Sequence, residues 1–406
     1  MTVFKADWVL PVGAEPIRNG WVAIEDGRVA AVSGTPTSGV IDLGRAVILP
    51  ALVNAHTHLE LSYLRGVVPP SARFLDWIAA IMAARRRYAN PEDPVILAAA
   101  RAGIEEARAS GTGLVGDISN TLVTVPLLRE GAMAARVFYE LLGFNVDDPA
   151  ARVRQARAKL NSHASAGDIR CALAPHAPYS VSPGLFRAIR EDIDAHPGDI
   201  STVHLGESPE ETSLLAHGTG PWRDLLTTLG VWTDRWKAPG VSAVEYLADL
   251  GFLDSRVLAV HGVQFQGSDL ARLRALGTPV VACPRSNRYV GVGDPPLEAF
   301  YAMGVTVAFG TDSLASVQDL NLFSELARAR QLASRVPARS LLESATRCGA
   351  AALGFGNEFG TIEVGKRAAL IAVRIPAAGA VDVEEYLLSG IQPDAVMWLP
   401  KNPDTQ

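Results

Sequence analysis

Eight short apolar segments recur along the middle of the chain, and stretches with helical patterning separate most of them. Most of these segments are too hydrophobic for a sheet with one wet face, as is typical of parallel strands covered on both sides. We expect strands at residues 47–56, 112–117, 134–142, 169–176, 200–205, 256–262, 279–284 and 305–312. Eight strand–helix units in about 300 residues predict an α/β fold, a TIM-like (β/α)8 barrel.

One of the intervening stretches, residues 93–111, has clear helix boundaries. Pro94 lies near its start and Gly111 follows its end, which is the usual arrangement. A doubly wound open sheet is the alternative to a barrel. No Gly-x-Gly-x-x-Gly or Walker loop follows any expected strand, and this argues against nucleotide phosphate binding.

Both ends of the chain differ from the middle because they read as short strands and turns. Asp26-Gly27 interrupts the apolar stretch GWVAIEDGRVAAVSG, which indicates a β-hairpin. The segment GTIEVGKRAALIAVRIP near the C-terminus has the same character. We therefore predict a small β-sandwich domain built from residues 1–48 and 359–406, with the barrel at residues 49–358.

Charge and cysteine content exclude several classes of protein. The formal net charge of −6 argues against a nucleic-acid or anionic-membrane surface. Arg85–Arg87 is the only basic run, and we interpret it as a solvated helix end. Cys171, Cys283 and Cys348 imply neither a disulfide framework nor a Cys-x-x-Cys zinc site. A start without a signal-peptide pattern and the lack of a long apolar run make the cytoplasm the expected location.

The polar residues of the expected strands fall at the carboxyl ends. In a parallel barrel those ends converge on one face, where the active site lies. Five of the eight histidines and one aspartate occupy such places, namely His56, His58, His176, His204, His261 and Asp312. The remaining histidines lie in polar or helical segments, and we interpret them as surface residues.

His56-Thr57-His58 is the sharpest of these features. Alternate residues of a strand point the same way, so both imidazoles can reach one ion. A His-x-His alone is weak, but this one ends a buried strand while other candidate ligands end other strands. Neutral imidazoles with a carboxylate suit zinc or ferrous iron and leave a position for water. We therefore predict a divalent metal ion, Zn or Fe, as the cofactor.

Glu207 follows His204 as the chain leaves the fifth strand. A carboxyl group at this point could exchange protons with a substrate beside the metal. The next residues, SPEE, are acidic as well. Composition alone therefore does not distinguish Glu207 from a surface glutamate.

Five segments, in chain order, resemble the amidohydrolase superfamily: PALVNAHTHLELSYLRG, APHAPYS, VHLGES, VHG and GTDSLAS. They are similar to its deaminase branch, which includes S-adenosylhomocysteine, adenosine and aminodeoxyfutalosine deaminases and related chlorohydrolases. The resemblance covers nearly the whole chain, because a split β domain also belongs to that pattern. It implies a hydrolase that acts on C–N bonds.

The resemblance also implies a role for each residue that matches a motif. The metal ligands would be His56, His58, His204 and Asp312. Glu207 would be the proton shuttle, His261 would hold the attacking hydroxide, and Asp312 would accept the proton of the water. Two-metal members use a bridging carboxylated lysine at the end of the fourth strand, or an equivalent. Here that strand delivers His176, and no lysine lies at a strand end, so one metal is favoured.

His-x-x-Glu at residues 204–207 favours deamination over amide hydrolysis. Attack on an aromatic amidine, such as C6 of an adenine ring, needs a proton donor for the ring nitrogen, whereas a metal can polarise an amide carbonyl by itself. Two alternatives stay open: an amide, lactam or halide hydrolase on the same scaffold, and a non-enzymatic scaffold protein. The segments HTHLELS, GDISN and GTDSLAS most resemble the aminodeoxyfutalosine deaminases of menaquinone biosynthesis. That resemblance implies 6-amino-6-deoxyfutalosine, a purine nucleoside with a carboxylated aryl group, as the substrate.

Residues near the strand ends are candidates for substrate contacts. Glu60, Ser62 and Glu140 could bond ribose hydroxyls or a ring edge. His176 matches a position that contacts substrate in similar enzymes. The expected partner is a small molecule rather than nucleic acid or a membrane. A homo-oligomer is compatible with the sequence, because many barrels of this kind self-associate.

Two further pairs of residues lie where they could reach a substrate. Phe74 and Trp77 could form a lid over an aromatic base, although their spacing equally fits an ordinary helix packing face. Arg285 and Arg288 could pair with a substrate carboxylate, since both lie on a loop after the seventh strand.

Overall fold

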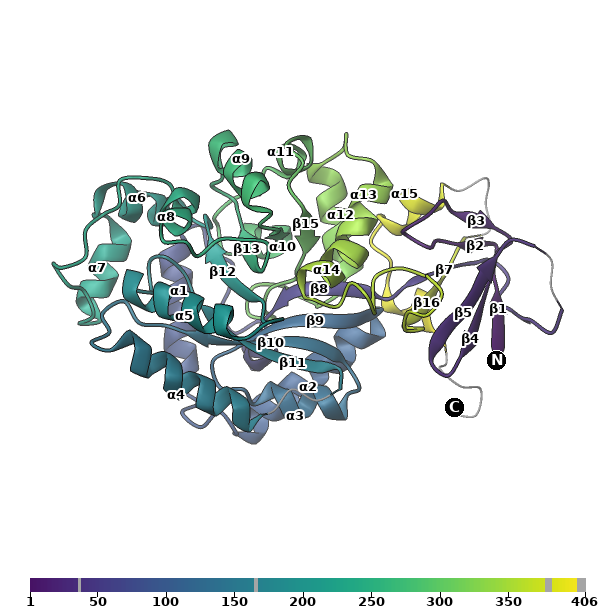
Figure 1. The fold of residues 1–406 in the computed structure, drawn as a ribbon, viewed down its shortest axis with the longest axis horizontal. Coiled ribbons are helices and arrows are strands. Elements are labelled where there is room, and N and C mark those ends of the chain that lie inside the picture. The colour runs from purple at the N-terminus through teal and green to yellow at the C-terminus, as the bar shows by residue number, and fades with distance from the viewer. Residues whose placement is uncertain (36–37, 164–166, 377–381, 400–406) are drawn as a thin grey trace.

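The computed structural model describes residues 1–35, 38–163, 167–376 and 382–399. Two four-stranded parallel sheets form its middle, with strand orders β11-β10-β9-β8 and β12-β13-β14-β15 (Figure 1). The strands are β8 (Leu52–Thr57), β9 (Thr112–Ser119), β10 (Ala134–Leu141), β11 (Ile169–Pro175), β12 (Ser201–Leu205), β13 (Val257–His261), β14 (Val280–Ala282) and β15 (Val307–Phe309). The predicted α/β fold with parallel strands is confirmed.

The two sheets are joined at both free edges by backbone hydrogen bonds. The His204 N–H in β12 donates to the carbonyl of His176, just after β11, at 2.9 Å. The Asp312 N–H, just after β15, donates to the carbonyl of His56 in β8 at 3.0 Å. Gly310 permits this second approach, because a Cβ there would lie 2.7 Å from the carbonyl oxygen of His56. The last strand therefore lies beside the first.

Helices connect and cover the strands (Figure 1). They are α1 (Phe74–Arg85), α2 (Pro94–Ala109), α3 (Thr124–Glu130), α4 (Pro149–Ser162), α5 (Pro183–Ala195), α6 (Pro209–His217), α7 (Pro221–Thr228), α8 (Ala243–Asp249), α9 (Gly267–Leu276), α10 (Pro284–Tyr289), α11 (Leu297–Ala302), α12 (Leu322–Leu332), α13 (Ala338–Glu343), α14 (Gly349–Ala352) and α15 (Val383–Leu387), with short helical turns η1 (Leu59–Leu64), η2 (Ser344–Cys348) and η3 (Pro393–Ala395). The expected helix boundaries of α2 are confirmed. The Asp93 carboxylate accepts from the Val95 N–H at its start, and Gly111 has a φ of 92° just beyond its end.

One expected strand, residues 47–56, is two strands in two different sheets. β7 (Ala46–Pro50) pairs with β16 (Leu370–Arg374) and β2 (Trp8–Val9), and only after Ala51 does the chain enter β8. Every residue of this run is buried. The apolar pattern therefore continues across the change of sheet, and the prediction of a single strand was wrong.

Two small sheets lie at one end of the molecule (Figure 1), and one of them combines strands from both ends of the chain. One has the order β5-β4-β1-β6 and the other β17-β16-β7-β2-β3. Their remaining strands are β1 (Thr2–Lys5), β3 (Ile17–Arg18), β4 (Trp21–Glu25), β5 (Arg28–Ser33), β6 (Ile41–Asp42) and β17 (Val396–Trp398). The predicted hairpin at Asp26-Gly27 is confirmed, because both residues have positive φ, 49° and 71°, as a two-residue turn requires.

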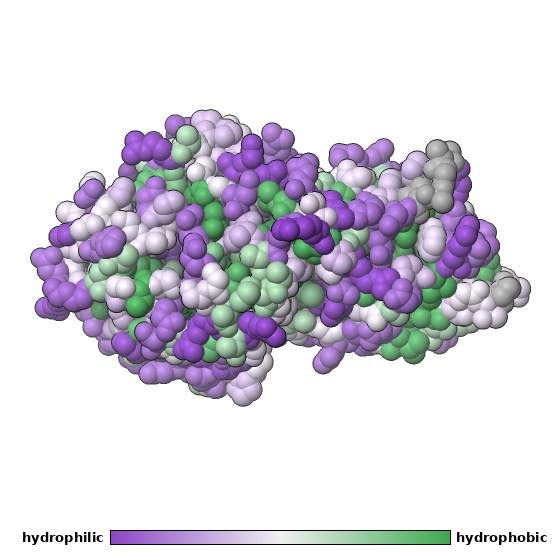
Figure 2. Space-filling model, turned by 90° about the horizontal axis from the view of Figure 1, so that it is seen from above, coloured by the Kyte–Doolittle hydropathy of each residue, from purple (hydrophilic) through white to green (hydrophobic). Residues whose placement is uncertain are grey.

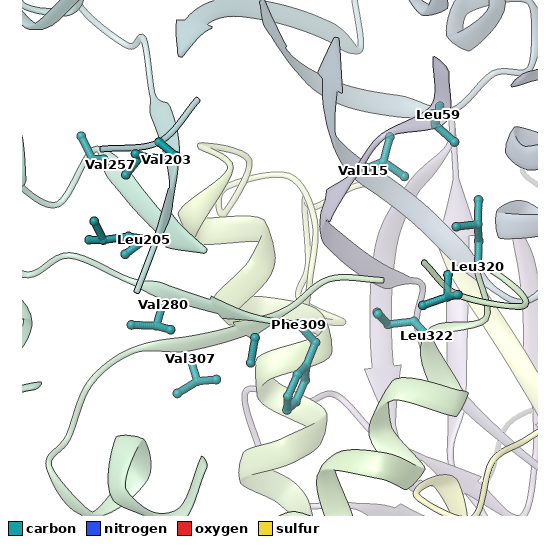
Figure 3. Close-up of a cluster of buried hydrophobic side chains, with 14 of the residues drawn as sticks. Leu59, Val115, Val203, Leu205, Val257, Val280, Val307, Phe309, Leu320 and Leu322 are labelled. Atoms are coloured by element: carbon teal, nitrogen blue, oxygen red, sulfur yellow. The ribbon is translucent and has the colours of Figure 1, made fainter. Parts of the chain in front are cut away.

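Side chains of the parallel strands alternate between two buried clusters. Val203, Val257 and Val280, from three neighbouring strands, belong to the larger cluster, and all are shown in Figure 3. Leu258 and Val281 belong to a second cluster of buried residues. Because successive strand residues point to opposite faces, the side chain of His204 leaves β12 on the face away from Val203.

The surface gives no sign of a membrane span. Within the residues that the structure describes, no helix combines the length and hydropathy needed to cross a bilayer. On the face seen in Figure 2, hydrophilic residues cover much of the area and apolar residues form small groups among them.

Candidate active site and metal centre

The structure brings together the five histidines that the sequence placed at strand ends. His56 lies in β8, His204 in β12 and His261 at the end of β13. The ring centroid of His204 is 4.9 Å from those of His56 and His176 and 5.5 Å from that of His58. Four separate strands thus deliver imidazoles to one place, because parallel strands finish on the same side of the fold.

Asp312 joins the cluster beside the His-x-His pair. The Nε2 atoms of His56 and His58 are 3.2 Å apart, and Asp312 Oδ1 lies 3.8 and 3.4 Å from them. Candidate ligand atoms of His56, His204 and His261 form an overlapping group, in which all lie within 4.8 Å of one another. His56 is common to both groups and lies at the centre of the arrangement.

The donor set fits a divalent cation. Burial, together with the neighbouring His204 and His58, holds the pKa of His56 well below its ordinary value. Burial likewise lowers the pKa of His58. Both imidazoles are therefore neutral near pH 7 and have a lone pair free to bind a metal. Neutral imidazole nitrogens with one carboxylate are the ligands that zinc and iron(II) accept.

Asp312 is fixed from several sides. The Ser286 hydroxyl donates to Oδ2 at 2.6 Å, and the Ser313 N–H donates to Oδ1 at 2.8 Å. Asp312 has a φ of 61° and His261 a φ of 80°, conformations that residues with a side chain rarely adopt. Such strain is tolerated only where the surrounding structure holds it, and it concentrates at functional sites.

His261 lies between the metal-ligand candidates and Glu207. Its Nε2 is 2.9 Å from Nδ1 of His204 and 3.6 Å from Oε1 of Glu207. On the other side of the ring, the Asn287 side-chain amide lies 2.9 Å from His261 Nδ1. Burial lowers the pKa of His261 to about 3, so the ring is neutral and Asn287 fixes which way it faces.

Glu207 is buried, with 6% of its surface exposed. Burial is the main cause that raises the pKa of its carboxyl group to about 8. The loop that carries it is held by Glu211, whose carboxylate accepts from the N–H groups of Gly206 and Glu207, each at 3.0 Å. Sequence reasoning missed Glu211. The signal was present, because Ser208-x-x-Glu211 begins α6 in the pattern of a capping box.

A cavity of about 670 Å³ opens above this cluster and receives some of the expected substrate contacts. Glu140 and His176 line it, together with His58, His204 and Glu207. Glu140 Oε1 lies 3.4 Å from His204 Nε2. Burial alone would raise the pKa of Glu140, but His176 and His204 hold it well below its ordinary value. Glu140 is therefore an ionised acceptor inside the cavity.

Glu60 and Ser62 are not brought to this cavity. The Glu60 carboxylate accepts from the Ser119 and Thr121 hydroxyls, each at 2.7 Å, and from the Asn120 N–H at 3.0 Å. The Ser62 hydroxyl donates to the Leu59 carbonyl at 2.7 Å. Glu60 thus binds the end of β9 and the residues after it, and Ser62 binds within η1, which a strand-end position in the sequence does not reveal.

Of the two other pairs predicted to contact substrate, one lines the cavity and one does not. Phe74 and Trp77 on α1 line the cavity. Arg285 does not, because its guanidinium pairs with both carboxylate oxygens of Asp319, at 2.9 and 3.0 Å. Arg288, with its side chain 70% exposed, also lies outside the cavity lining.

The chain is similar to proteins of known activity over most of its length. A match to the amidohydrolase family spans residues 47–394. The chain is 34% identical over 319 residues to the aminodeoxyfutalosine deaminase of Deinococcus radiodurans, which covers 76% of this chain and 74% of that protein. It is 32% identical over 383 residues to the 5-methylthioadenosine/S-adenosylhomocysteine deaminase of Halobacterium salinarum, covering 89% and 81%.

Solved structures give the same result. An adenosine deaminase from Xanthomonas campestris, with bound zinc, has a TM-score of 0.83 and 27% identity, over 97% of this chain and 90% of that one. The resemblance predicted from five short segments of the sequence is therefore confirmed. The chain belongs to the amidohydrolase family and is a hydrolytic enzyme that acts on C–N bonds.

Proposed function

We propose that this enzyme is a metal-dependent deaminase that replaces the 6-amino group of a purine nucleoside by oxygen, with release of ammonia. The observation that carries the proposal is the placement of Glu207 and His261. Both lie beside a cluster of imidazoles and Asp312, at one cavity large enough for a nucleoside. An adjacent buried acid is what deamination of an aromatic ring requires and what amide hydrolysis can do without.

The proposed ligands of one divalent metal, zinc or iron, are His56, His58, His204 and Asp312. A metal bound among these residues would lower the pKa of a water molecule to about 7 and so make hydroxide available at neutral pH. The zinc found in the Xanthomonas campestris adenosine deaminase is consistent with this choice.

The protein side chains then handle the protons. The Glu207 carboxyl donates to the ring nitrogen next to C6 as a C–O bond forms at that carbon. His261 directs the attacking oxygen by hydrogen bonding through Nε2. Asp312 takes up one proton of the water, and transfer of this proton to the amino group lets the C–N bond break with loss of ammonia. The proton left on the new C6 oxygen passes to Glu207, which leaves the 6-oxo product and restores the carboxyl group. Proton transfer by a positioned group contributes about 10²–10⁴-fold to such a step.

The substrate that we propose first is 6-amino-6-deoxyfutalosine. The 34% identity to the aminodeoxyfutalosine deaminase of Deinococcus radiodurans supports it. The 5-methylthioadenosine/S-adenosylhomocysteine deaminase of Halobacterium salinarum is nearly as similar, so its substrates are the natural competitors. Glu140, an ionised acceptor in the cavity, would bind ribose hydroxyls in any of these nucleosides.

We also propose that the eight parallel strands form one closed (β/α)8 barrel and that the two small sheets form a β-sandwich built from both ends of the chain. The hydrogen bonds at both sheet edges support the barrel. A shared cluster that includes Phe4, Val22, Ile48 and Leu370 supports the sandwich. Because β7 pairs within a small sheet, the boundary falls after Pro50 rather than at residue 48.

Ammonia release from a panel of nucleosides tests the proposed function. Purified protein loaded with zinc or iron(II) would be incubated with adenosine, 5′-methylthioadenosine, S-adenosylhomocysteine and 6-amino-6-deoxyfutalosine. We expect ammonia in equal amount to the hypoxanthine nucleoside formed, and the highest kcat/KM for the last compound. If none of the four released ammonia while an amide, lactam or aryl halide was hydrolysed, the deaminase assignment would be wrong.

A further inference from the structure

The cavity above the histidine cluster has an aromatic wall that leads away from the metal-ligand candidates. His176 lies 5.6 Å from Tyr179, ring centre to ring centre, and Tyr179 stacks on Trp222 at 3.9 Å. Trp222 is 6.2 Å from Phe74, which stacks at 6.4 Å with Trp77 on α1. This run of rings joins the inner end of the cavity to α1. The rings beyond His176 are nearly buried in the protein, at 2–8% exposed, and they line the cavity.

Further apolar residues of α1 continue that wall, among them Ile78, Ile81 and Met82. Leu229 and Val231, after α7, lie across the cavity and are 41% and 37% exposed. Large apolar side chains left exposed around a cavity indicate a surface that a ligand covers. A substrate segment that lies here is therefore apolar, and flat if it stacks on the rings.

Among the described residues that line the cavity, two carry a fixed positive charge, and they differ in whether the protein provides a partner. Arg85, at the end of α1, donates to Asn120 Oδ1 at 3.1 Å and lies 3.7 Å from Glu60 Oε1. Arg86, the next residue, is exposed. Among the described residues, none offers the Arg86 guanidinium a hydrogen bond or an ion pair. The protein therefore provides partners for the Arg85 guanidinium, whereas the Arg86 guanidinium is available to a ligand.

We propose that Arg86 binds a carboxylate at the far end of a substrate whose apolar, aryl segment lies along the Phe74–Trp77–Trp222 wall. The inference rests on the proposed function, since the 6-aminopurine must occupy the inner end beside Glu207. A guanidinium matches a carboxylate with two parallel N–H donors. The Arg86 guanidinium at the edge of an otherwise apolar wall therefore favours a substrate with a carboxylate, because a neutral substituent would not form these two hydrogen bonds. The run Arg85–Arg87 was interpreted from the sequence as a solvated helix end. In this proposal one of its residues, Arg86, binds the substrate.

A matched pair of substrates tests the proposal. The first is 6-amino-6-deoxyfutalosine, and the second is its methyl ester, which keeps the aryl group and removes the negative charge. We expect the free acid to be preferred in kcat/KM, and the ratio of acid to ester to fall about tenfold in Arg86→Gln, the worth of a modest hydrogen bond to a charged group. Added salt should narrow the wild-type ratio, because an exposed charge pair is screened.

Arg87→Gln is the control, because Arg87 is a neighbouring exposed arginine that does not line the cavity. Its acid-to-ester ratio should equal that of the wild type. Deamination of both substrates with an unchanged ratio in Arg86→Gln would overturn the Arg86 assignment alone. Failure of the wild type to deaminate either compound or adenosine would overturn the proposed function, and the Arg86 assignment with it.

Discussion

Two large cavities are found in the described part of the molecule, and the histidine cluster lines only the smaller one. The larger one has a volume of about 950 Å³ and lies between the small sheets and the starts of β9 and β10. Its three arginines all have partners within the protein. Arg367 Nη2 lies 2.6 Å from Asp168 Oδ1, the Arg28 guanidinium donates to the Gly365 carbonyl at 2.7 Å, and Arg108 stacks over the Trp398 ring at 4.7 Å.

The smaller cavity, of about 670 Å³, is built in the opposite way. Imidazoles face one another at its inner end, two residues of the site have a strained backbone, and the buried Glu207 has a raised pKa. Volume therefore does not identify the site. The site is identified by buried polar atoms that converge on one place and lack a full set of partners within the protein. Burying such atoms costs free energy unless a ligand binds to them.

The largest effect should come from removing a proposed ligand. His58→Ala should abolish metal binding and lower kcat/KM at least 10³-fold, on the order of the loss expected when the metal's activation of water disappears. Metal content by mass spectrometry and ammonia release would be measured together.

His196→Ala is the control for this variant. His196 belongs to a His–carboxylate group that does not line the cavity, with Asp192 and Asp199. Arg157 pairs with both of these carboxylates, so this group needs no cation. If His196→Ala lost the metal and His58→Ala kept it, the assignment of His58 as a metal ligand would be wrong.

The next largest effect concerns the acid. Glu207→Gln should retain the metal and lower kcat about 10²–10⁴-fold, because an amide cannot donate a proton to the ring nitrogen in the way a carboxylic acid does. Glu210→Gln, three residues further along the same acidic segment, should keep its rate since Glu210 does not line the cavity. Normal turnover by Glu207→Gln would remove the proton-shuttle role.

A smaller effect is expected at the residue that holds the Glu207 loop. Glu211→Gln leaves only one carbonyl oxygen to accept the two N–H groups of Gly206 and Glu207. We expect kcat to fall about tenfold, on the order of one lost hydrogen bond to a charged group, with metal content unchanged. A fall in the thermal midpoint alone, at full kcat, would make Glu211 a purely structural residue.

The smallest effect should come from the larger cavity. Asp168→Asn weakens the pair with Arg367, whose partners are about one-third exposed, at 37% and 31%. The free energy of unfolding should fall by about 1 kcal/mol or less, as for other exposed ion pairs, and kcat/KM should not change. A loss of activity comparable to that of Glu211→Gln would break the contrast between the two cavities.

Much of the fold and of the site could be predicted from the sequence, because both depend on local pattern. Buried parallel strands are continuous apolar runs, and His56, His204 and His261 mark where three of them end. The change of sheet at Ala51 could not be predicted from the sequence, because both flanking strands are wholly buried. Hydrophobicity records burial and carries no information on which neighbour a strand pairs with.

The sequence also did not reveal which charged side chains have partners in the folded protein. Glu60 and Arg285 lie where substrate contacts were expected, yet loops far along the chain neutralise them. Arg86 was passed over because it sits in a run of three arginines that reads as a solvated surface. Whether a charge is free or paired depends on residues brought near by the fold, so sequence order alone could not separate Arg85 from Arg86.

Anomalous diffraction from crystals of the metal-loaded protein tests the convergence of strand ends on one cation most directly. We predict a single peak, about 2.0–2.2 Å from ligand atoms of His56, His58, His204 and Asp312. A peak only at Asp192, His196 and Asp199, two peaks within the histidine cluster, or no peak in protein that releases ammonia would contradict it.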